Sequence, residues 1–122
     1  MIHPNSTLLY VDNPPVSTEF YRNLFGVEPV EASATFAMFV LSTGMKLGLW
    51  SRHTVEPKAS TAGGGGEIAF RVDGDAVVDT TFADWKAKNI AILQPPAKMD
   101  FGYTFTASDP DGHRLRVYAF AG

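Results

Sequence analysis

The chain has 122 residues, which is enough for one domain with a substantial hydrophobic core. It is 45% hydrophobic and 19% charged, and its net charge of −3 gives no reason to expect nucleic acid or an anionic membrane as a partner. Cysteine is absent, which excludes disulfides, thiolate chemistry and cysteine metal sites. Because the sequence shows neither a basic and apolar leader nor the roughly 20 apolar residues of a membrane helix, we expect a cytoplasmic protein.

The first predicted elements are a strand and an amphipathic helix. The apolar run at residues 7–11 consists of strand-forming residues and ends at a polar, proline-rich segment. Within that segment, Asn13 has the side chain of a helix cap and Pro14 suits a first helical turn. The helix is predicted to end at Gly26. Val16, Phe20 and Leu24 recur at four-residue spacing, with Tyr21 and Phe25 alongside, which is the pattern of an apolar helix face.

A hairpin and a linker complete the first half. Residues 35–41 and 45–50 are predicted to be two strands joined by a short polar turn. The loop that follows contains His53, which we expect to be solvated, and it ends in four consecutive glycines. Such a tract has little conformational preference, so residues 53–66 are predicted to be a linker.

The same order of elements recurs in the second half. Residues 68–72 have the pattern of a strand, and a helix is predicted to begin after Asp73. The apolar side chains at helical spacing on this helix are Val78, Phe82 and Trp85. Because Trp85 continues this stripe, we interpret it as a core residue.

The last predicted elements are three strands with two connections. A strand at 90–93 leads into residues 94–100, which contain two prolines. This segment is interpreted either as a plain loop or as a lid, with Met99 and Phe101 offered to a ligand. The strands at 103–107 and 115–120 form a hairpin around Asp109-Pro110-Asp111-Gly112, a strong turn signal. His113 follows the turn and is expected to be exposed.

The two halves repeat with an offset of 61 residues, because Val11-Asp12 before the first helix corresponds to Val72-Asp73 before the second. A unit of strand, helix and three strands is therefore used twice. We predict an α+β fold of two βαβββ modules within a single domain, residues 1–122. Module 1 spans residues 1–52 and module 2 spans residues 67–122.

Two motifs in this order resemble a known family. Asp12 followed by the segment Phe20–Gly26 resembles the first helix of the vicinal oxygen chelate superfamily, which includes glyoxalase I, extradiol dioxygenases and bleomycin-binding proteins. Asp109–His113 resembles the hairpin turn of that superfamily. The resemblance implies that the sheets curl around a cavity, and that a short chain forms a homodimer whose cavities are shared between modules of two exchanged chains.

Enzymes of this superfamily hold a divalent metal through His, Gln or Glu side chains on the first and last strands of each module. The resemblance places the corresponding positions at Ser6, Gly48, Glu67 and Arg116. Only Glu67 is a good ligand, and the guanidinium of Arg116 offers no lone pair. We therefore predict no metal and no cofactor, and we expect Arg116 and Glu67 to form an ion pair in place of the metal. The alternatives are that the pair only stabilises the floor of the cavity, or that the two residues do not meet.

Side chains on one face of a strand recur at every second residue, so the parity of these four positions identifies their neighbours. Trp50 therefore lies on the same strand face as Gly48. In the same way, Tyr10 shares a face with Ser6, and Tyr118 shares a face with Arg116. Gly48 is expected to leave room for a flat group close to the backbone. The predicted ligand-binding residues are Ser6, Tyr10, Gly48, Trp50, Glu67, Met99, Arg116 and Tyr118.

Three hypotheses for function follow from this site. In the first, the chain is a non-catalytic protein that sequesters a planar aromatic molecule, as implied by its similarity at residues 47–50 and 109–117 to phenazine-antibiotic resistance proteins, with Trp50 as the stacking platform. In the second, it is a metal-dependent lyase or dioxygenase with an unusual ligand set that includes Glu67. In the third, it is a dimerisation module in which Trp50 packs at the interface and the cavity is filled.

Overall fold

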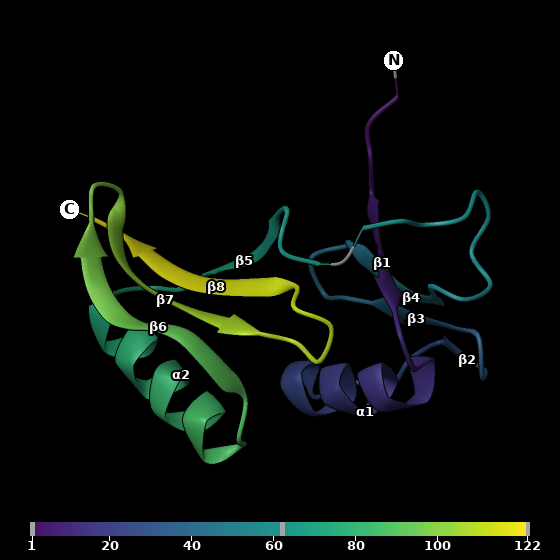
Figure 1. Ribbon diagram of the computed structural model, residues 1–122. Helices are drawn as coiled ribbons and strands as arrows, with labels where there is room; N and C mark the ends of the chain where they lie inside the picture. Colours follow the sequence, from purple (N-terminus) through teal and green to yellow (C-terminus); the bar gives the residue numbers. More distant parts are fainter. Residues whose placement is uncertain (1, 62, 122) are drawn as a thin grey trace. The chain divides into compact units, whose positions relative to one another are not determined.

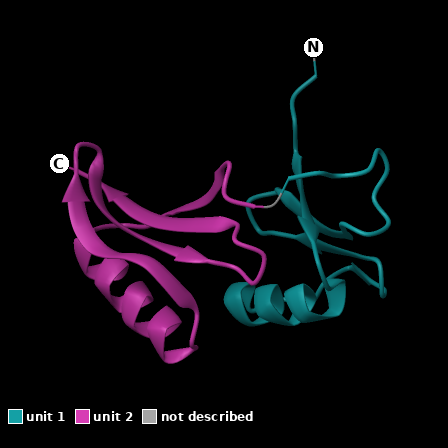
Figure 2. Cartoon of the chain, in the orientation of Figure 1, with its two compact units in different colours: residues 1–62 teal, residues 63–122 magenta. Residues whose placement is uncertain are grey.

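The computed structural model describes residues 2–61 and 63–121. The chain forms two compact units, residues 1–62 and residues 63–122 (Figure 2). Each unit contains one strand, one helix and then three strands, in the order β1-α1-β2-β3-β4 and β5-α2-β6-β7-β8 (Figure 1). This order confirms the α+β fold in which a βαβββ module is used twice. No helix of the described residues is long and apolar enough to cross a membrane.

Unit 1 is a four-stranded mixed sheet with one helix. Its elements are β1 (Ser6–Val11), α1 (Pro14–Phe25), β2 (Glu31–Ala32), β3 (Phe36–Val40) and β4 (Lys46–Ser51). The strands lie in the order β1-β4-β3-β2, with β1 parallel to β4 and the other pairs antiparallel. The edge strand β1 is therefore joined to the sheet only through β4.

The ends of α1 are fixed by local sequence, as predicted. The Asn13 side chain accepts a hydrogen bond from the Val16 amide at 3.3 Å, and Pro14 occupies the first turn, where no amide donor is needed. At the other end Gly26 adopts a left-handed conformation with φ of 69°, and its amide donates to the Arg22 carbonyl oxygen at 2.9 Å.

The buried face of α1 includes Tyr21, as predicted, but it is otherwise shifted from the predicted apolar stripe. Val16 is 53% exposed, whereas Ser17 and Thr18 are buried and Tyr21 is fully buried. Small side chains at 17 and 18 allow the helix to pack against the sheet, and the Tyr21 side chain is buried between the helix and the sheet. The number of apolar side chains therefore does not by itself predict which face of the helix packs.

Unit 2 repeats this architecture. Its elements are β5 (Glu67–Arg71), α2 (Asp75–Ala87), β6 (Ala91–Met99), β7 (Gly102–Ser108) and β8 (Arg114–Phe120). The strands lie in the order β5-β8-β7-β6, and β5 runs parallel to β8. Trp85 is 5% exposed and packs edge-to-face against Phe70 and Phe105, which confirms it as a core residue.

The segment 94–100 was predicted to be a loop, and this prediction is wrong for most of its length. Strand β6 continues through Gln94, Pro95 and Pro96 to Met99, with register shifts between Ile92 and Gln94 and between Gln94 and Ala97. Proline lacks an amide donor, but β6 lies at an edge of its sheet, where a missing donor breaks no second ladder. The segment is therefore a bulged edge strand and not a lid.

In each unit the helix covers one face of the sheet and leaves the other face open (Figure 1). In unit 1 the covered face contains buried Phe39, Leu47 and Leu49. In unit 2 it contains buried Phe105 and Leu115. We call the uncovered sides the open face of unit 1 and the open face of unit 2.

Candidate functional site

The eight predicted site residues lie on these two open faces, four in each unit. Ser6, Tyr10, Gly48 and Trp50 belong to unit 1, and Glu67, Met99, Arg116 and Tyr118 belong to unit 2.

On the open face of unit 1, neighbouring strands bring aromatic side chains together. Tyr10 is paired in register with Trp50, and Trp50 is paired with Phe36 on its other side. The rings of Phe36 and Trp50 pack edge-to-face, with centroids 6.1 Å apart and planes at 89°. Tyr10 is 41% exposed. Phe36 was not predicted as a site residue, although the short turn between the two hairpin strands places it opposite Trp50.

The space above Gly48 is not empty, contrary to expectation. A Cβ atom placed on Gly48 would lie 2.5 Å from Leu8 Cδ2 and 3.3 Å from Phe36 Cζ. The glycine therefore permits close packing of these two side chains in this conformation. Ser6 lies at the end of the same face, is exposed, and donates its hydroxyl to the Asn5 side-chain oxygen at 3.1 Å.

On the open face of unit 2, Arg116 and Glu67 form the expected ion pair. Arg116 Nε donates to one carboxylate oxygen of Glu67 at 2.6 Å, and Arg116 Nη2 donates to the other at 2.9 Å. Arg116 Nη1 also donates to the Thr104 hydroxyl at 3.2 Å, and that hydroxyl donates to the Val117 carbonyl oxygen at 2.8 Å. The two-pronged pair is thus anchored to β7 and β8.

The pKa values of both partners reflect this pairing. The hydrogen bond from Arg116 lowers the pKa of the Glu67 carboxyl despite partial burial, with smaller contributions from the charges of Arg116 and Arg114. The same hydrogen bond raises the pKa of Arg116. Both groups therefore stay charged over the neutral range.

Glu67→Gln should remove a component of stability that depends on pH. A carboxyl with a depressed folded pKa stabilises the fold above its unfolded value of about 4.3, and this contribution disappears as the pH falls through the folded pKa. At pH 7 the variant should be less stable by about 1–2 kcal/mol, because partly buried Arg116 loses a charged partner. Urea unfolding between about pH 3 and pH 7 measures this, and the difference should shrink toward the acid end. Glu31→Gln, at an exposed position, is the control; a constant difference across this range would contradict the prediction.

Beside the ion pair lies a row of aromatic rings that the prediction only partly identified. Tyr118 packs edge-to-face with Phe101 and with Phe120, at centroid distances of 6.1 and 5.2 Å. The Arg116 guanidinium lies over the Phe101 ring at 5.9 Å, and that of Arg71 lies over the Phe120 ring at 4.5 Å. Phe101 and Phe120 are 39% and 53% exposed. Phe101 was considered only as a contact of the possible lid, and Phe120 was missed.

Met99 lies at the margin of this row. It is 44% exposed and lines a pocket of about 370 Å³ together with Phe120 and Gly102. Its position in the register opposite Gly102, which is in turn opposite Phe120, places all three on one sheet face. A flexible thioether at the margin of an aromatic row can adapt to ligands of different outline.

The donor atoms at the predicted metal positions do not fit a divalent metal. Both Glu67 oxygens are engaged by Arg116, and a guanidinium is a fixed cation that cannot act as a ligand. Ser6 and Gly48 offer no strong donor. Among residues 2–61 and 63–121, no group of three or more His, Cys, Asp or Glu residues is arranged to hold a metal ion.

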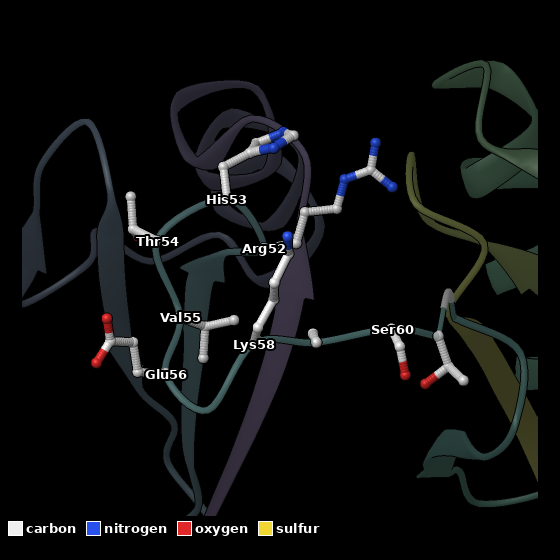
Figure 3. A pocket seen from close by; sticks show the side chains of 9 residues that line it. Arg52, His53, Thr54, Val55, Glu56, Lys58 and Ser60 are labelled. Carbon is white, nitrogen blue, oxygen red and sulfur yellow. The ribbon is translucent and has the colours of Figure 1, made fainter.

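A second pocket, of about 680 Å³, lies in the loop after β4 and contains none of the predicted site residues (Figure 3). Its charged lining residues are Arg52, Glu56 and Lys58, and His53 also lines it. Arg52 and His53 both contact the Asp12 carboxylate, at 3.3 and 2.8 Å, and the His53 contact is the main cause of a lowered Asp12 pKa. This carboxylate offsets the positive charge of the pocket, so the pocket is a weak candidate for binding an anion.

His113 was expected to be exposed, but only 14% of its side chain is. Its ring Nδ1 contacts the Asp109 carboxylate at 2.8 Å, and the Asp109 side chain is fully buried. The other Asp109 oxygen accepts the amides of Asp111 and His113, both at 2.9 Å. Asp109 therefore organises the turn before β8, and its hydrogen bond to His113 is the main cause of a raised His113 pKa.

Asp109→Asn should destabilise the chain by about 2 kcal/mol, because it replaces a charged acceptor of three hydrogen bonds by an amide. A histidine with a raised folded pKa contributes its linked stability fully below its unfolded pKa of about 6.5 and loses it as the pH rises through the folded value. The difference between the wild-type chain and the variant should therefore be larger at about pH 6 than at about pH 9. Thermal unfolding at both pH values tests this, with exposed Asp100→Asn as the control. A difference that grows with pH would contradict it.

Comparison with known proteins agrees with this architecture. Residues 3–117 match the model of the family described as the Glyoxalase/Bleomycin resistance protein/Dioxygenase superfamily. A phenazine antibiotic resistance protein, EhpR of Enterobacter agglomerans, is 37% identical over 119 residues, covering 95% of this chain and 91% of that protein.

Two solved structures are also similar. The solution structure of protein ATC0852 from Agrobacterium tumefaciens is 74% identical, covers the whole of both chains and has a TM-score of 0.92. A glyoxalase-related enzyme from Fulvimarina pelagi is 21% identical, with 98% of this chain and 88% of that one covered and a TM-score of 0.84, which shows the shared fold.

Proposed function

The chain belongs to the glyoxalase/bleomycin resistance protein/dioxygenase superfamily, and from this we propose that it is a non-catalytic protein that sequesters a planar aromatic molecule such as a phenazine. The observation that carries the proposal is the two-pronged Arg116–Glu67 ion pair. The sequence resemblance places these two residues at positions that hold a metal in enzymes of the superfamily.

The absence of catalysis in this proposal rests on the chemistry of the donor set. A fixed cation at Arg116 repels a divalent metal, and Glu67 already uses both oxygens. The exposed aromatic side chains beside them supply binding surface rather than a nucleophile and a base. We therefore assign the site to ligand binding.

The choice of a planar aromatic ligand is supported by the aromatic side chains of the two open faces. Trp50 with Tyr10 on one face, and Tyr118 with its neighbours on the other, present rings on which a flat molecule can stack. Each such contact contributes about 0.5–1.5 kcal/mol beyond the burial of area. The similarity to a protein whose name states phenazine antibiotic resistance supports a ligand of that class.

We also propose that the chain is a homodimer that exchanges modules. Both open faces expose large apolar side chains, including Leu8, Tyr10 and Phe101 at about 40% each. A second copy of the chain can cover part of this apolar surface and enclose the ligand. Light scattering coupled to gel filtration should give twice the mass of one chain, and a monomer at micromolar concentration would contradict the dimer.

Titration with phenazine tests the proposed function. We expect quenching of tryptophan fluorescence and heat of binding with a dissociation constant on the order of micromolar, as for other drug-sized ligands in aromatic pockets. Elemental analysis of the same preparation should find no stoichiometric zinc, nickel, manganese or iron. Absence of binding across a panel of planar ligands, or a stoichiometric metal that is lost in Glu67→Ala, would overturn the proposal.

A further inference from the structure

The middle of the open face of unit 1 is closed by side chains although a glycine lies beneath it. Gly48 is at the centre of β4 and is itself buried. Leu8 lies opposite it on β1, and the Phe36 ring reaches it from β3, so that a Cβ atom at position 48 would be 2.5 Å from Leu8 Cδ2 and 3.3 Å from Phe36 Cζ. These two side chains therefore fill the space that the glycine leaves.

Leu8 and Phe36 are held to different degrees. The Phe36 ring packs edge-to-face against Trp50, which fixes its position. Leu8 lies on the edge strand of its sheet and is 44% exposed. The nearest atom is the far end of the leucine side chain, so a change of its rotamer can clear the Leu8 side of this space without a backbone shift, while the Phe36 ring stays in place on the other side.

We propose that Leu8 is a gate over a flat slot on Gly48, and that a planar aromatic ring enters this slot when Leu8 rotates away. The inference rests on the proposed function and specifies where, and at what cost, the ligand binds. The floor of the slot is the Gly48 backbone and one wall is the Phe36–Trp50 pair. Only a flat molecule lies close to a backbone flanked by such a wall, so Leu8 and Gly48 together select ligands by thickness.

A ligand that enters the slot must first displace the Leu8 side chain, which costs free energy. The buried part of Leu8 must return to water, and this lowers the affinity. Leu8→Ala removes the cost, so the variant should bind phenazine about tenfold more tightly than the wild-type chain in calorimetric titration. Gly48→Ala should act in the opposite direction, because its methyl group occupies the slot.

Val77→Ala is the control. Val77 is also an aliphatic side chain that is partly exposed, at 38%, but it lies on helix α2, away from both open faces, so its removal should leave phenazine affinity unchanged. Equal affinity of Leu8→Ala and the wild-type chain, or weaker binding by the variant, would overturn the gate while leaving the proposed function intact. Binding of phenazine by neither protein would overturn both.

A measurement on the wild-type chain tests the Leu8 gate even if either variant folds poorly. In methyl-selective NMR, the free protein should show a nuclear Overhauser effect between a Leu8 methyl group and the Gly48 α-protons. Addition of phenazine should replace it with one between phenazine and the same α-protons. Binding of phenazine with the Leu8–Gly48 effect unchanged would overturn the gate.

Discussion

Replacing Trp50 with alanine is expected to weaken phenazine binding about a hundredfold, which corresponds to about 2.7 kcal/mol. Trp50 is the largest side chain on the open face of unit 1, and it lies in register between Tyr10 and Phe36. Its removal eliminates a stacking surface and also frees the Phe36 ring, which packs against it. Both losses reduce the area on which a flat ligand rests.

Isothermal titration calorimetry is the measurement, because the substitution also removes a fluorophore. Trp50→Phe should recover part of the affinity, since a smaller ring still offers a face. Trp85→Phe is the control, because Trp85 packs in the core of unit 2 and should affect stability but not binding. Unchanged affinity in Trp50→Ala would indicate that Trp50 serves packing alone.

Gly102→Ala is expected to cost about 3–5 kcal/mol of unfolding free energy, which approaches the whole stability of a small domain. Gly102 begins β7 with φ of +147°, a region that side chains disfavour. A Cβ atom there would lie 2.0 Å from the Ala119 carbonyl oxygen and 2.8 Å from the Ala121 amide nitrogen. The clash is with backbone on the neighbouring strand, so no side chain can relieve it.

The same substitution should also disturb the open face of unit 2, since Met99 and Phe120 are both paired in register with Gly102. Urea unfolding followed by circular dichroism measures the loss. Gly66→Ala is the control, because a Cβ atom there meets nothing within 4 Å and its φ is not positive, so it should change stability by less than about 0.5 kcal/mol. A Gly102→Ala chain as stable as this control would show that the strand pairing can move apart.

Most elements of the fold were predictable because their signals are local. Asn13 and Gly26 mark the ends of α1 through hydrogen bonds to residues three or four positions away. The turn before β8 is organised by Asp109 in the same way. The repeat relates each position in one module to a position in the other. Together with the family resemblance, this allowed the prediction that Glu67 and Arg116 meet although 49 residues separate them.

The errors arose where the surroundings of a segment determine its structure. The sequence Gln94-Pro95-Pro96 has the composition of a loop, and it forms a strand only because β6 has a single neighbour in its sheet. Likewise, the number of apolar side chains does not by itself predict the buried face of α1, since small Ser17 and Thr18 are buried while Val16 is exposed.

The candidate site also has one part that the sequence predicted and another that only the structure revealed. The sequence repeat, together with the family resemblance, was enough to predict that Arg116 and Glu67 meet, because the repeat carries a position in one module to its counterpart in the other. Only the tertiary structure decided that Phe101 and Phe120 flank Tyr118 and that Leu8 covers Gly48, since these contacts depend on strand pairing and side-chain rotamers. Parity places a side chain on a face, whereas packing between strands determines which space it fills.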